Sequence, residues 1–261
     1  MGSGEAVSVQ VDNLPDFWTR VKKSEHRLLA LDYDGTLAPF HVAPMRAYPL
    51  PGIPALLHAL GKTRDTTVAI ISGRPVQELN TLLGDAGITL IGCHGFELID
   101  RDGNLTVKSP NREQLEGMER AIEAAARLGL HGKLEIKTAS VALHTRGMPE
   151  NEASRIEEMI LREWSEGSSF DLGCRRFNGG VEMYCTGWNK ADAMNDLLRT
   201  QPPEALPVYI GDDTTDEDVF LMLHESGIGI KVGLPGTTTA ARGFLPSCEA
   251  VRAFLESWLS L

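Results

Sequence analysis

The sequence predicts an α/β protein with two parts: a core built on a parallel sheet, and a smaller α+β domain inserted into that core. In residues 1–106 and 187–261, short apolar runs alternate with helical patterns, which is typical of parallel strands covered by helices on both faces. In residues 107–186 the order changes to αββαββ, and the strands alternate apolar and polar side chains. This second pattern predicts a small antiparallel sheet with helices on one face.

The apolar runs of the core have the length and composition of buried strands. They are 27–34, 66–73, 88–95, 206–213 and 228–233. Helical periodicity is found between and around them, at 14–23, 52–62, 75–84, 215–226 and 249–261. Local signals support these bounds, because Pro75 opens one helix and Gly84 closes it, at positions where these residue types are favoured.

In the inserted domain, helices are predicted at 112–129 and 149–167, two strands within 133–146, and a hairpin over 170–186 that turns at Gly179–Gly180. Strand alternation places apolar side chains on one face, which we expect to pack on the two helices. They are Leu134, Ile136, Val141, Leu143, Val181, Met183 and Cys185. The other face is polar, and the pattern alone leaves open whether solvent or a ligand meets it. It carries Glu135, Lys137, His144, Arg146, Glu182 and Tyr184.

Composition and charge restrict the partners of the protein. The 261 residues carry a formal net charge of −11, which argues against nucleic acid or an anionic membrane and requires local positive charge for any phosphorylated ligand. No apolar run is long enough to span a membrane and the N-terminus lacks a secretory pattern, so we expect a cytoplasmic protein. The four cysteines form no CxxC pair and are expected as reduced thiols, although Cys174 and Cys185 could face each other across the hairpin.

The first candidate site lies where the strand at 27–34 ends. Asp32 and Asp34 are two residues apart, so their side chains point the same way as the chain leaves the sheet. Ligands of open α/β sheets bind at this carboxyl edge. Gly35 allows a sharp turn there, and Thr36 can cap or bond nearby groups. Two close carboxylates repel each other unless a cation or a shared proton relieves them, yet an isolated pair of this kind is more often only solvated.

Further acidic and anion-binding residues follow other strands. Asp212, Asp213 and Asp216 come at the end of the strand at 206–213. Carboxylates from two strand ends can share one hard cation with oxygen ligands, and Mg²⁺ is the natural choice. At a third strand end, Ser72, Gly73 and Arg74 offer a hydroxyl and backbone N–H groups that suit an anion. Lys190 stands in the first turn of a predicted helix before the strand at 206–213.

These motifs, DYDGT, SGR, the downstream lysine and GDDTTDE, resemble in their order the four motifs of the haloacid dehalogenase (HAD) superfamily. The resemblance covers the whole core and implies a Rossmann-like fold, while the αββαββ insert resembles the C2-type cap of that superfamily. Within it, the chain is similar to the trehalose-6-phosphate phosphatase family. That similarity lies in LDYDGTLAPF, AIISGRP, GCHGFEL, LEIKTASVALHTR, GGVEMYCTGWNKADA and VYIGDDTTDEDVF. Cys93 and Ala191 replace the serine and glycine that are more common in the family, which leaves the chemistry intact.

The resemblance implies roles for the acidic residues and the lysine. Asp32 is expected to be the nucleophile that forms an aspartyl-phosphate, with Mg²⁺ held by Asp32, the backbone carbonyl of Asp34, and Asp212. The Asp34 side chain would protonate the leaving oxygen and later deprotonate a water, a role that a raised pKa would suit. Ser72 and Lys190 would hold phosphoryl oxygens. Asp213 and Asp216 are expected to support the site by orienting either the waters of the metal or Lys190.

The resemblance also assigns substrate-binding residues. Gly73 and Arg74 belong to the phosphate-binding segment, although Arg74 could equally be a structural ion pair. Glu135, Lys137 and Glu182 of the insert are assigned to sugar hydroxyls. His94 either supports the site or is a hydrogen-bonded structural histidine.

The function that this resemblance implies is Mg²⁺-dependent hydrolysis of trehalose 6-phosphate to trehalose and phosphate, a step of trehalose biosynthesis. A first alternative is the same chemistry on another small sugar phosphate, such as glucosylglycerol phosphate, mannosylglycerate phosphate or sucrose phosphate. A phosphomutase would share the aspartyl-phosphate and differ in excluding water. A non-catalytic sugar-phosphate sensor would be expected to lack the nucleophile or a metal ligand, yet Asp32, Asp34, Lys190 and Asp212 are all present.

Overall fold

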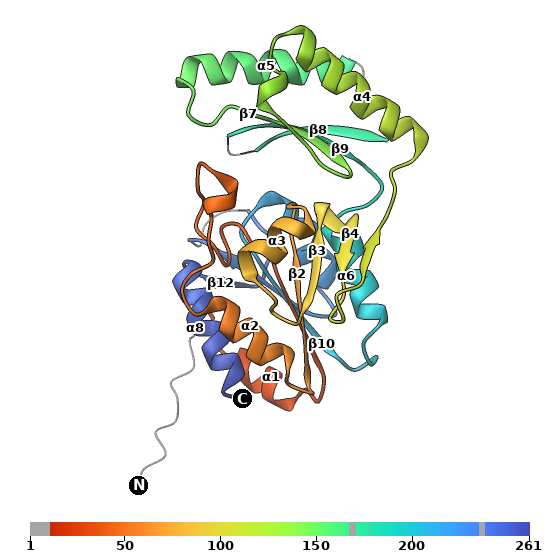
Figure 1. Ribbon diagram of the computed structural model, residues 1–261. Helices are drawn as coiled ribbons and strands as arrows, with labels where there is room; N and C mark the ends of the chain where they lie inside the picture. The colour runs from red at the N-terminus through yellow and green to blue at the C-terminus, as the bar shows by residue number, and fades with distance from the viewer. Residues whose placement is uncertain (1–10, 167–170, 178, 235–237) are drawn as a thin grey trace. The chain divides into compact units, whose positions relative to one another are not determined.

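The computed structural model describes residues 11–166, 171–177, 179–234 and 238–261 (Figure 1). The chain divides into two compact units, Met1–Thr106 with Asn189–Leu261, and Val107–Trp188. We call the first the core and the second the insert. The insert expected from the sequence begins at the same residue and ends at 186 rather than 188.

The core sheet has the strand order β12-β11-β10-β1-β2-β3-β4-β5. Its strands are β1 (Arg27–Leu31), β2 (Thr66–Ile71), β3 (Thr89–Gly92), β4 (Glu97–Ile99), β5 (Leu105–Val107), β10 (Leu206–Gly211), β11 (Ile228–Val232) and β12 (Gly243–Leu245). From β12 to β3 all neighbours are parallel, which confirms the predicted parallel sheet. Strand β1 is buried along its whole length because helices cover both faces, which explains its continuous apolar sequence. Since β1 lies between β2 and β10, three carboxyl ends meet at one edge.

The sheet is mixed, and not wholly parallel as the sequence had predicted. Strand β4 pairs antiparallel with β3, and Gly92 lies opposite Glu97. The reason is the short connection between them, a 3-10 turn at Cys93–Gly95, because parallel neighbours need a long crossover. Strands β4, β5 and β12 are only three residues long, and β5 is exposed, so they lack the apolar runs that mark the inner strands.

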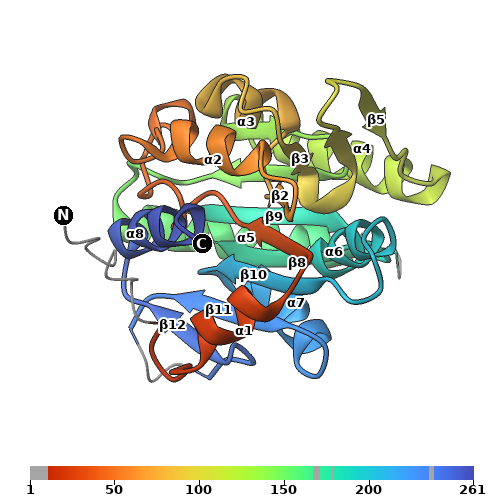
Figure 2. The same ribbon diagram turned by 90° about the horizontal axis from the view of Figure 1, so that it is seen from below.

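Helices cover both faces of the core sheet (Figure 2). The larger apolar cluster includes side chains of α1 (Phe17–Lys23), α2 (Ile53–Gly61), α3 (Val76–Leu83) and α8 (Cys248–Leu259). The cluster on the opposite face includes α6 (Lys190–Arg199) and α7 (Glu217–Leu223). Short 3-10 turns lie at Pro44–Arg46 and Thr214–Asp216. None of the helices in the described ranges has the length and apolar character needed to cross a membrane.

The insert has the predicted αββαββ order. Its antiparallel sheet has the strand order β6-β7-β9-β8, with two helices on one face (Figure 1). The elements are α4 (Arg112–Arg127), a 3-10 turn (His131–Lys133), β6 (Leu134–Ile136), β7 (Ser140–His144), α5 (Glu150–Glu166), β8 (Leu172–Phe177) and β9 (Gly180–Cys185). The apolar face is confirmed in the central strands, where Val141, Leu143, Val181 and Met183 are buried. On the helix side Trp164 is buried and its indole N–H donates to the Ala121 carbonyl.

Two expectations for the insert were wrong. Ile136 is 57% exposed, because β6 is an edge strand of the sheet. Cys174 and Cys185 do not face each other, since the hairpin pairs Cys174 with Met183 and Leu172 with Cys185. All four cysteines are free thiols, as expected.

Candidate active site

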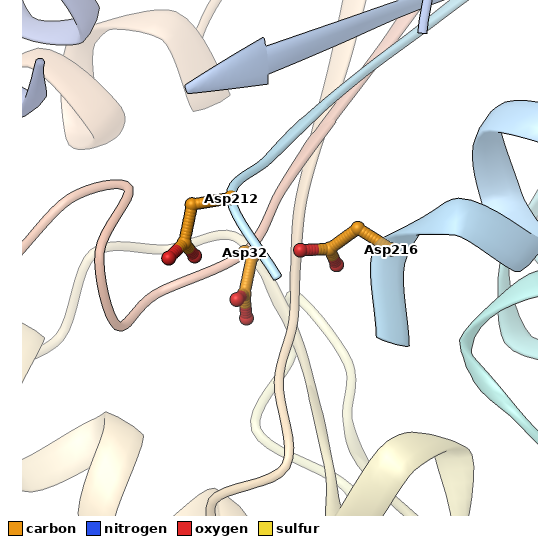
Figure 3. Close-up of side chains that lie close together, drawn as sticks. All are labelled: Asp32, Asp212 and Asp216. Atoms are coloured by element: carbon orange, nitrogen blue, oxygen red, sulfur yellow. The ribbon is translucent and has the colours of Figure 1, made fainter. Parts of the chain in front are cut away.

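Carboxylates from two adjacent strands meet at the carboxyl edge of the core sheet. Asp32 follows β1 and Asp212 follows β10, and the N–H of Asp32 donates to the carbonyl of Ile210 at 2.8 Å. Asp216 joins them from the 3-10 turn that precedes α7 (Figure 3). Each of these three side chains offers an oxygen, and these oxygens all lie within 4.8 Å of one another. The parallel pairing of β1 with β10 therefore brings together side chains that are far apart in the sequence.

The surroundings of Asp212 fit a bound cation. Its Oδ1 is buried and has no hydrogen-bond partner among the described residues. Burial, together with the charges of Asp32 and Asp216, raises the pKa of Asp212 to about 8. Burial also raises the pKa of Asp32 to about 7, against the opposing effect of Lys190. A divalent cation with oxygen ligands would satisfy the open Asp212 oxygen and relieve this repulsion, so the residues present suit Mg²⁺.

Gly35 makes the close approach of Asp212 possible. Its φ of +73° lies in the left-handed region, and a Cβ at this position would overlap the Asp212 carboxylate. Two local constraints therefore favour glycine at this position of the DYDGT motif: the left-handed backbone conformation and the lack of space for a Cβ. The neighbouring Thr36 hydroxyl is also buried without a partner among the described residues, so the capping role expected for it is not seen.

Lys190 is the positive charge of the cluster. Its side chain is 2% exposed, and Nζ lies 2.8 Å from Asp216 Oδ1 and 3.0 Å from Asp32 Oδ1. Burial alone would lower the pKa of Lys190, but the two carboxylates outweigh it and raise the pKa above its ordinary value. The lysine is the first residue of α6, as predicted, and Asn189 caps that helix in a capping box with Asp192. A charged amine is thus held on a rigid helix start beside Asp32.

Asp216 accepts hydrogen bonds from three protein donors. Its Oδ1 accepts from Lys190 and, at 2.6 Å, from the Tyr209 hydroxyl, while Oδ2 accepts from the N–H of Asp213 at 2.9 Å. It is fully buried. Asp216 was expected to orient either the waters of the metal or Lys190, and the structure contains its contact with Lys190. Asp213 is exposed and accepts from the N–H of Thr214, so it caps the turn that carries Asp216.

Asp34 and Arg74 form a two-point ion pair. Nε and Nη2 of Arg74 donate to the two oxygens of Asp34 at 2.6 and 2.7 Å. Arg74 also donates to Glu78 at 3.0 Å and lies 5.3 Å from the centre of the Tyr33 ring. Of the two alternatives left open for Arg74, this structure contains the ion pair. It also ties up the carboxylate of Asp34, because an oxygen that accepts from the guanidinium cannot at the same time bind a proton along that direction.

The segment after β2 carries Ser72 into the same edge of the sheet. Ser72 is 2% exposed, and its Oγ accepts from the N–H of Arg74 at 3.3 Å. Gly73 packs against His94, where a Cβ at residue 73 would lie 2.6 Å from Nε2 of the ring. The N–H of Val76 donates to Glu97, so this N–H at the start of α3 is occupied by a carboxylate of the protein.

The polar face of the insert sheet holds an ordered network of its own. Glu135 lies 2.7 Å from Nε2 of His144 and 3.8 Å from Nζ of Lys137. The His144 contact and the charge of Lys137 lower the pKa of Glu135 against the effect of its burial, which is the largest single influence. Glu182 is 5% exposed; its oxygens accept from Ser140 at 2.8 Å and from Arg175 at 2.6 Å. The strand register places Glu135 opposite Ala142, Ala142 opposite Glu182, and Glu182 opposite Arg175. Lys137 joins this surface through its contact with Glu135, so Glu135, Lys137 and Glu182 share it with Arg175.

Some residues of these networks were not found from the sequence. The predicted turn at Gly179–Gly180 would pair Arg175 with Tyr184, on the same face as Glu182, whereas the structure pairs Arg175 with Glu182 because Phe177 lies opposite Gly180. Tyr209 lies inside an apolar strand, and Glu97 lies inside the GCHGFEL motif, where only His94 was assigned a possible role. The sequence does not show the partner of either residue, since these partners are set by the packing of separate elements.

The fold and the side chains at its sheet edge define a class, the HAD-type phosphatases. A solved C-terminal domain of a trehalose-6-phosphate phosphatase from C. albicans has this fold, with a TM-score of 0.84 over 99% of this chain and 100% of that chain, at 22% identity. The trehalose-phosphatase family model matches residues 30–242. The chain belongs to the trehalose-phosphatase family, and it is a phosphatase.

Two relatives show how the chain compares in length. A probable trehalose-phosphate phosphatase from Sinorhizobium fredii is 32% identical over 88% of this chain and 86% of its own length. A bifunctional trehalose-6-phosphate synthase/phosphatase from Thermoproteus tenax is also 32% identical, over 89% of this chain but only 31% of its own length. The chain thus spans most of the first relative and about a third of the second.

Proposed function

We propose that this protein hydrolyses trehalose 6-phosphate to trehalose and inorganic phosphate, with Mg²⁺ as cofactor and an aspartyl-phosphate on Asp32 as intermediate. The observation that carries the proposal is the buried Asp32 beside Lys190, at 3.0 Å, in a chain of the trehalose-phosphatase family. The substrate follows from the relatives, which are described as trehalose-phosphate phosphatases. The step belongs to trehalose biosynthesis.

In the first half of the reaction, an oxygen of Asp32 attacks phosphorus and the bond to the sugar oxygen breaks. A carboxylate is a weak nucleophile, so position and charge compensation must supply most of the acceleration. Lys190 provides a fixed ammonium for the phosphoryl oxygens, and Asp216 and Tyr209 hold it in place. Ser72 donates its hydroxyl to another phosphoryl oxygen, because its present contact uses it only as an acceptor.

Mg²⁺ would be held by Asp32, Asp212 and the backbone carbonyl of Asp34. Asp212 is favoured over Asp216 as the acidic ligand because it has an open, buried oxygen while Asp216 accepts from three donors. When bound, the cation offsets the negative charge of the phosphoryl group and of the carboxylates around it. Asp213 supports this arrangement only through the turn that it caps.

Asp34 is proposed as the general acid for the leaving sugar oxygen and as the base for the water that hydrolyses the aspartyl-phosphate. The Arg74 pair adds a condition to this role. To carry a proton along the direction that the guanidinium now occupies, an oxygen of Asp34 has to leave Arg74. Arg74 is then free to contact the phosphoryl group, so the two alternatives for this residue become two stages of one cycle.

Glu135, Lys137 and Glu182 are proposed to bind the hydroxyls of the sugar. Carboxylates and amines on a shared face are suitable partners for a ligand with many hydroxyls. Glu135 and Lys137 are more accessible, with side chains 27% and 13% exposed, and are proposed as direct contacts. Glu182 has both oxygens occupied by protein donors, so its contribution includes holding Arg175 on the same face.

Phosphate release with a panel of substrates tests the proposal. The panel contains trehalose 6-phosphate, glucosylglycerol phosphate, mannosylglycerate phosphate and sucrose phosphate at equal concentration, each with and without Mg²⁺. We expect the highest kcat/KM on trehalose 6-phosphate, dependence on Mg²⁺, and no turnover by Asp32→Asn. A higher kcat/KM on another sugar phosphate would reject the substrate, and phosphate release by Asp32→Asn would reject the intermediate.

A further inference from the structure

The segment from Ile91 in β3 to Glu97 in β4 is hydrogen-bonded to the segment that carries Ser72 and Arg74. Three backbone hydrogen bonds join them: Ser72 N–H to the Ile91 carbonyl at 2.9 Å, His94 N–H to the Ser72 carbonyl at 2.9 Å, and Cys93 N–H to the Arg74 carbonyl at 2.8 Å. A fourth bond runs from Val76 N–H to the Glu97 carboxylate at 2.9 Å. These contacts hold residues 72–76, which we call the phosphate segment, along its whole length.

Glu97 completes the start of α3. The residue at the N-cap is Pro75, which makes no side-chain cap, so the first N–H groups of this helix depend on another partner. Glu97 is 9% exposed and reaches the N–H of Val76 from strand β4. Its negative charge also lies at the positive end of the helix dipole. One carboxylate therefore fixes the C-terminal end of the phosphate segment.

His94 closes on the middle of the same segment. Cys93 and His94 both have positive φ, +47° and +56°, a conformation that side-chain-bearing residues adopt at a cost and that the surrounding hydrogen bonds maintain. This turn brings the His94 ring against Gly73, close enough that any Cβ there would meet it at 2.6 Å. Gly73 itself has no positive φ, so its backbone would accept alanine and the ring is the obstacle.

We propose that Glu97 and His94 are positioning residues for the phosphate segment, acting through Val76 and Gly73 on Ser72 and Arg74. The proposal rests on the proposed function, since it assigns phosphoryl binding to Ser72. Because Arg74 holds Asp34, the contacts of Glu97 and His94 with the phosphate segment also fix the position of Asp34, the proposed general acid. Glu97 and His94 touch neither phosphate nor sugar in this account.

The first test compares Glu97→Gln, Glu97→Ala and Leu82→Ala. Glutamine retains an oxygen for the N–H of Val76, whereas alanine removes it. Leu82 lies in the buried face of the same helix, so its truncation destabilises α3 without touching the phosphate segment. The measurements are Kd for inorganic phosphate with Mg²⁺ present, by calorimetry, and kcat/KM, both well below each variant's Tm.

We expect Glu97→Ala to weaken phosphate binding and lower kcat/KM by about 10- to 100-fold, the range that small misplacement of binding groups can cause. Glu97→Gln should stay within about threefold of wild type, since its amide oxygen replaces one acceptor of the same geometry. Leu82→Ala should have a lower Tm than wild type and the same Kd for inorganic phosphate. Equal losses of Kd in Leu82→Ala and Glu97→Ala, or a wild-type Kd in Glu97→Ala, would overturn the role of Glu97.

The second test uses a steric rescue that only direct contact can produce. Gly73→Ala should weaken phosphate binding because its Cβ meets the His94 ring. Adding His94→Gly removes the ring and suits the left-handed backbone, so the double variant should recover at least about threefold in Kd, as expected for residues in contact. A double variant no better than Gly73→Ala overturns the role of His94. If wild type binds phosphate but does not hydrolyse trehalose 6-phosphate, the proposed substrate is wrong. Both phosphate-binding tests would still decide whether Glu97 and His94 position the phosphate segment.

Discussion

Arg74 donates to both carboxylate oxygens of Asp34, at 2.6 and 2.7 Å, across forty positions of sequence. The pair joins the segment after β1 to the segment after β2, which are neighbours only because those strands pair in parallel. It holds the proposed general acid in one orientation and keeps a buried guanidinium at the site. In the proposed mechanism, this contact is exchanged for contacts with substrate during each turnover.

Replacing Arg74 tests the importance of this pair. Arg74→Ala should lower kcat/KM for trehalose 6-phosphate by about 10- to 100-fold, because hydrogen bonds to a charged group at this site are lost. Glu78→Gln is the control: it weakens the Arg74–Glu78 ion pair and leaves the contact with Asp34, so we expect a change within about threefold. Steady-state kinetics of both variants decide the matter, and similar losses in the two would show that the Asp34 contact is not the important one.

Asp212→Asn tests the cation site. Removing one charge from the carboxylate cluster should raise the Mg²⁺ concentration for half-maximal activity by at least about 10- to 100-fold, the range known for residues that only support a metal's ligands. The matched control is Asp213→Asn, which makes the same charge change at the adjacent residue but retains an oxygen for the N–H of Thr214. Mg²⁺ titrations of activity, or of Tm, give the result. Equal Mg²⁺ requirements in the two variants would contradict the assignment of Asp212.

The same titration should depend on pH. Burial raises the pKa of Asp32 to about 7 and of Asp212 to about 8, so protons compete with the cation for these carboxylates. Lowering the pH from 8 to 6 protonates both groups in the metal-free protein, and Mg²⁺ should bind more weakly at pH 6. The stability of the metal-free protein should depend on pH in the opposite direction. Because these acids hold protons longer in the folded state, its stability should fall as pH rises between about 4 and 8. A Mg²⁺-induced rise in Tm that is larger at pH 6 than at pH 8 would contradict this prediction.

Glu135→Ala tests sugar recognition by the insert. The variant should have a KM for trehalose 6-phosphate about tenfold higher, since it lacks the charged group that is proposed to bind a sugar hydroxyl. Hydrolysis of p-nitrophenyl phosphate, which has no sugar, should remain unchanged. Glu158→Ala removes the same charge from an exposed position on helix α5 and should alter neither substrate. Equal losses of Glu135→Ala on both substrates would argue against a role of this face in recognition.

Gly35→Ala and Gly52→Ala separate backbone strain from crowding at the site. Both glycines have positive φ, so alanine should cost each about 1–2 kcal/mol of stability. Only at residue 35 does a Cβ meet another group, the Asp212 carboxylate, whereas nothing lies within 4 Å of a Cβ at residue 52. Gly35→Ala should therefore lose roughly 1–3 kcal/mol more and should also need more Mg²⁺. Urea unfolding and Mg²⁺ titration measure the two effects, and identical behaviour of the variants would refute the crowding at Gly35.

The sequence predicted the elements of this protein because their signals are local. The apolar runs of β1, β2 and β10 and the alternation in β7 and β9 follow from which faces are buried, and the acids at the strand ends can be read directly. The short strands β4 and β5 were missed because β5 is exposed and neither is long enough to show a period. Ile136 was misplaced because alternation predicts a face, and does not predict whether a helix covers it.

What the sequence alone determined is therefore the list of elements, their order, and the presence of aspartates, a serine and a lysine at one edge of a parallel sheet. The tertiary structure decided which of these side chains contact each other: Arg74 with Asp34, Lys190 with Asp216, and Glu97 with the start of α3. The physical reason is range. Burial and backbone preferences act over a few residues, whereas an ion pair or a cap between separate elements depends on strand register and packing across the whole sheet.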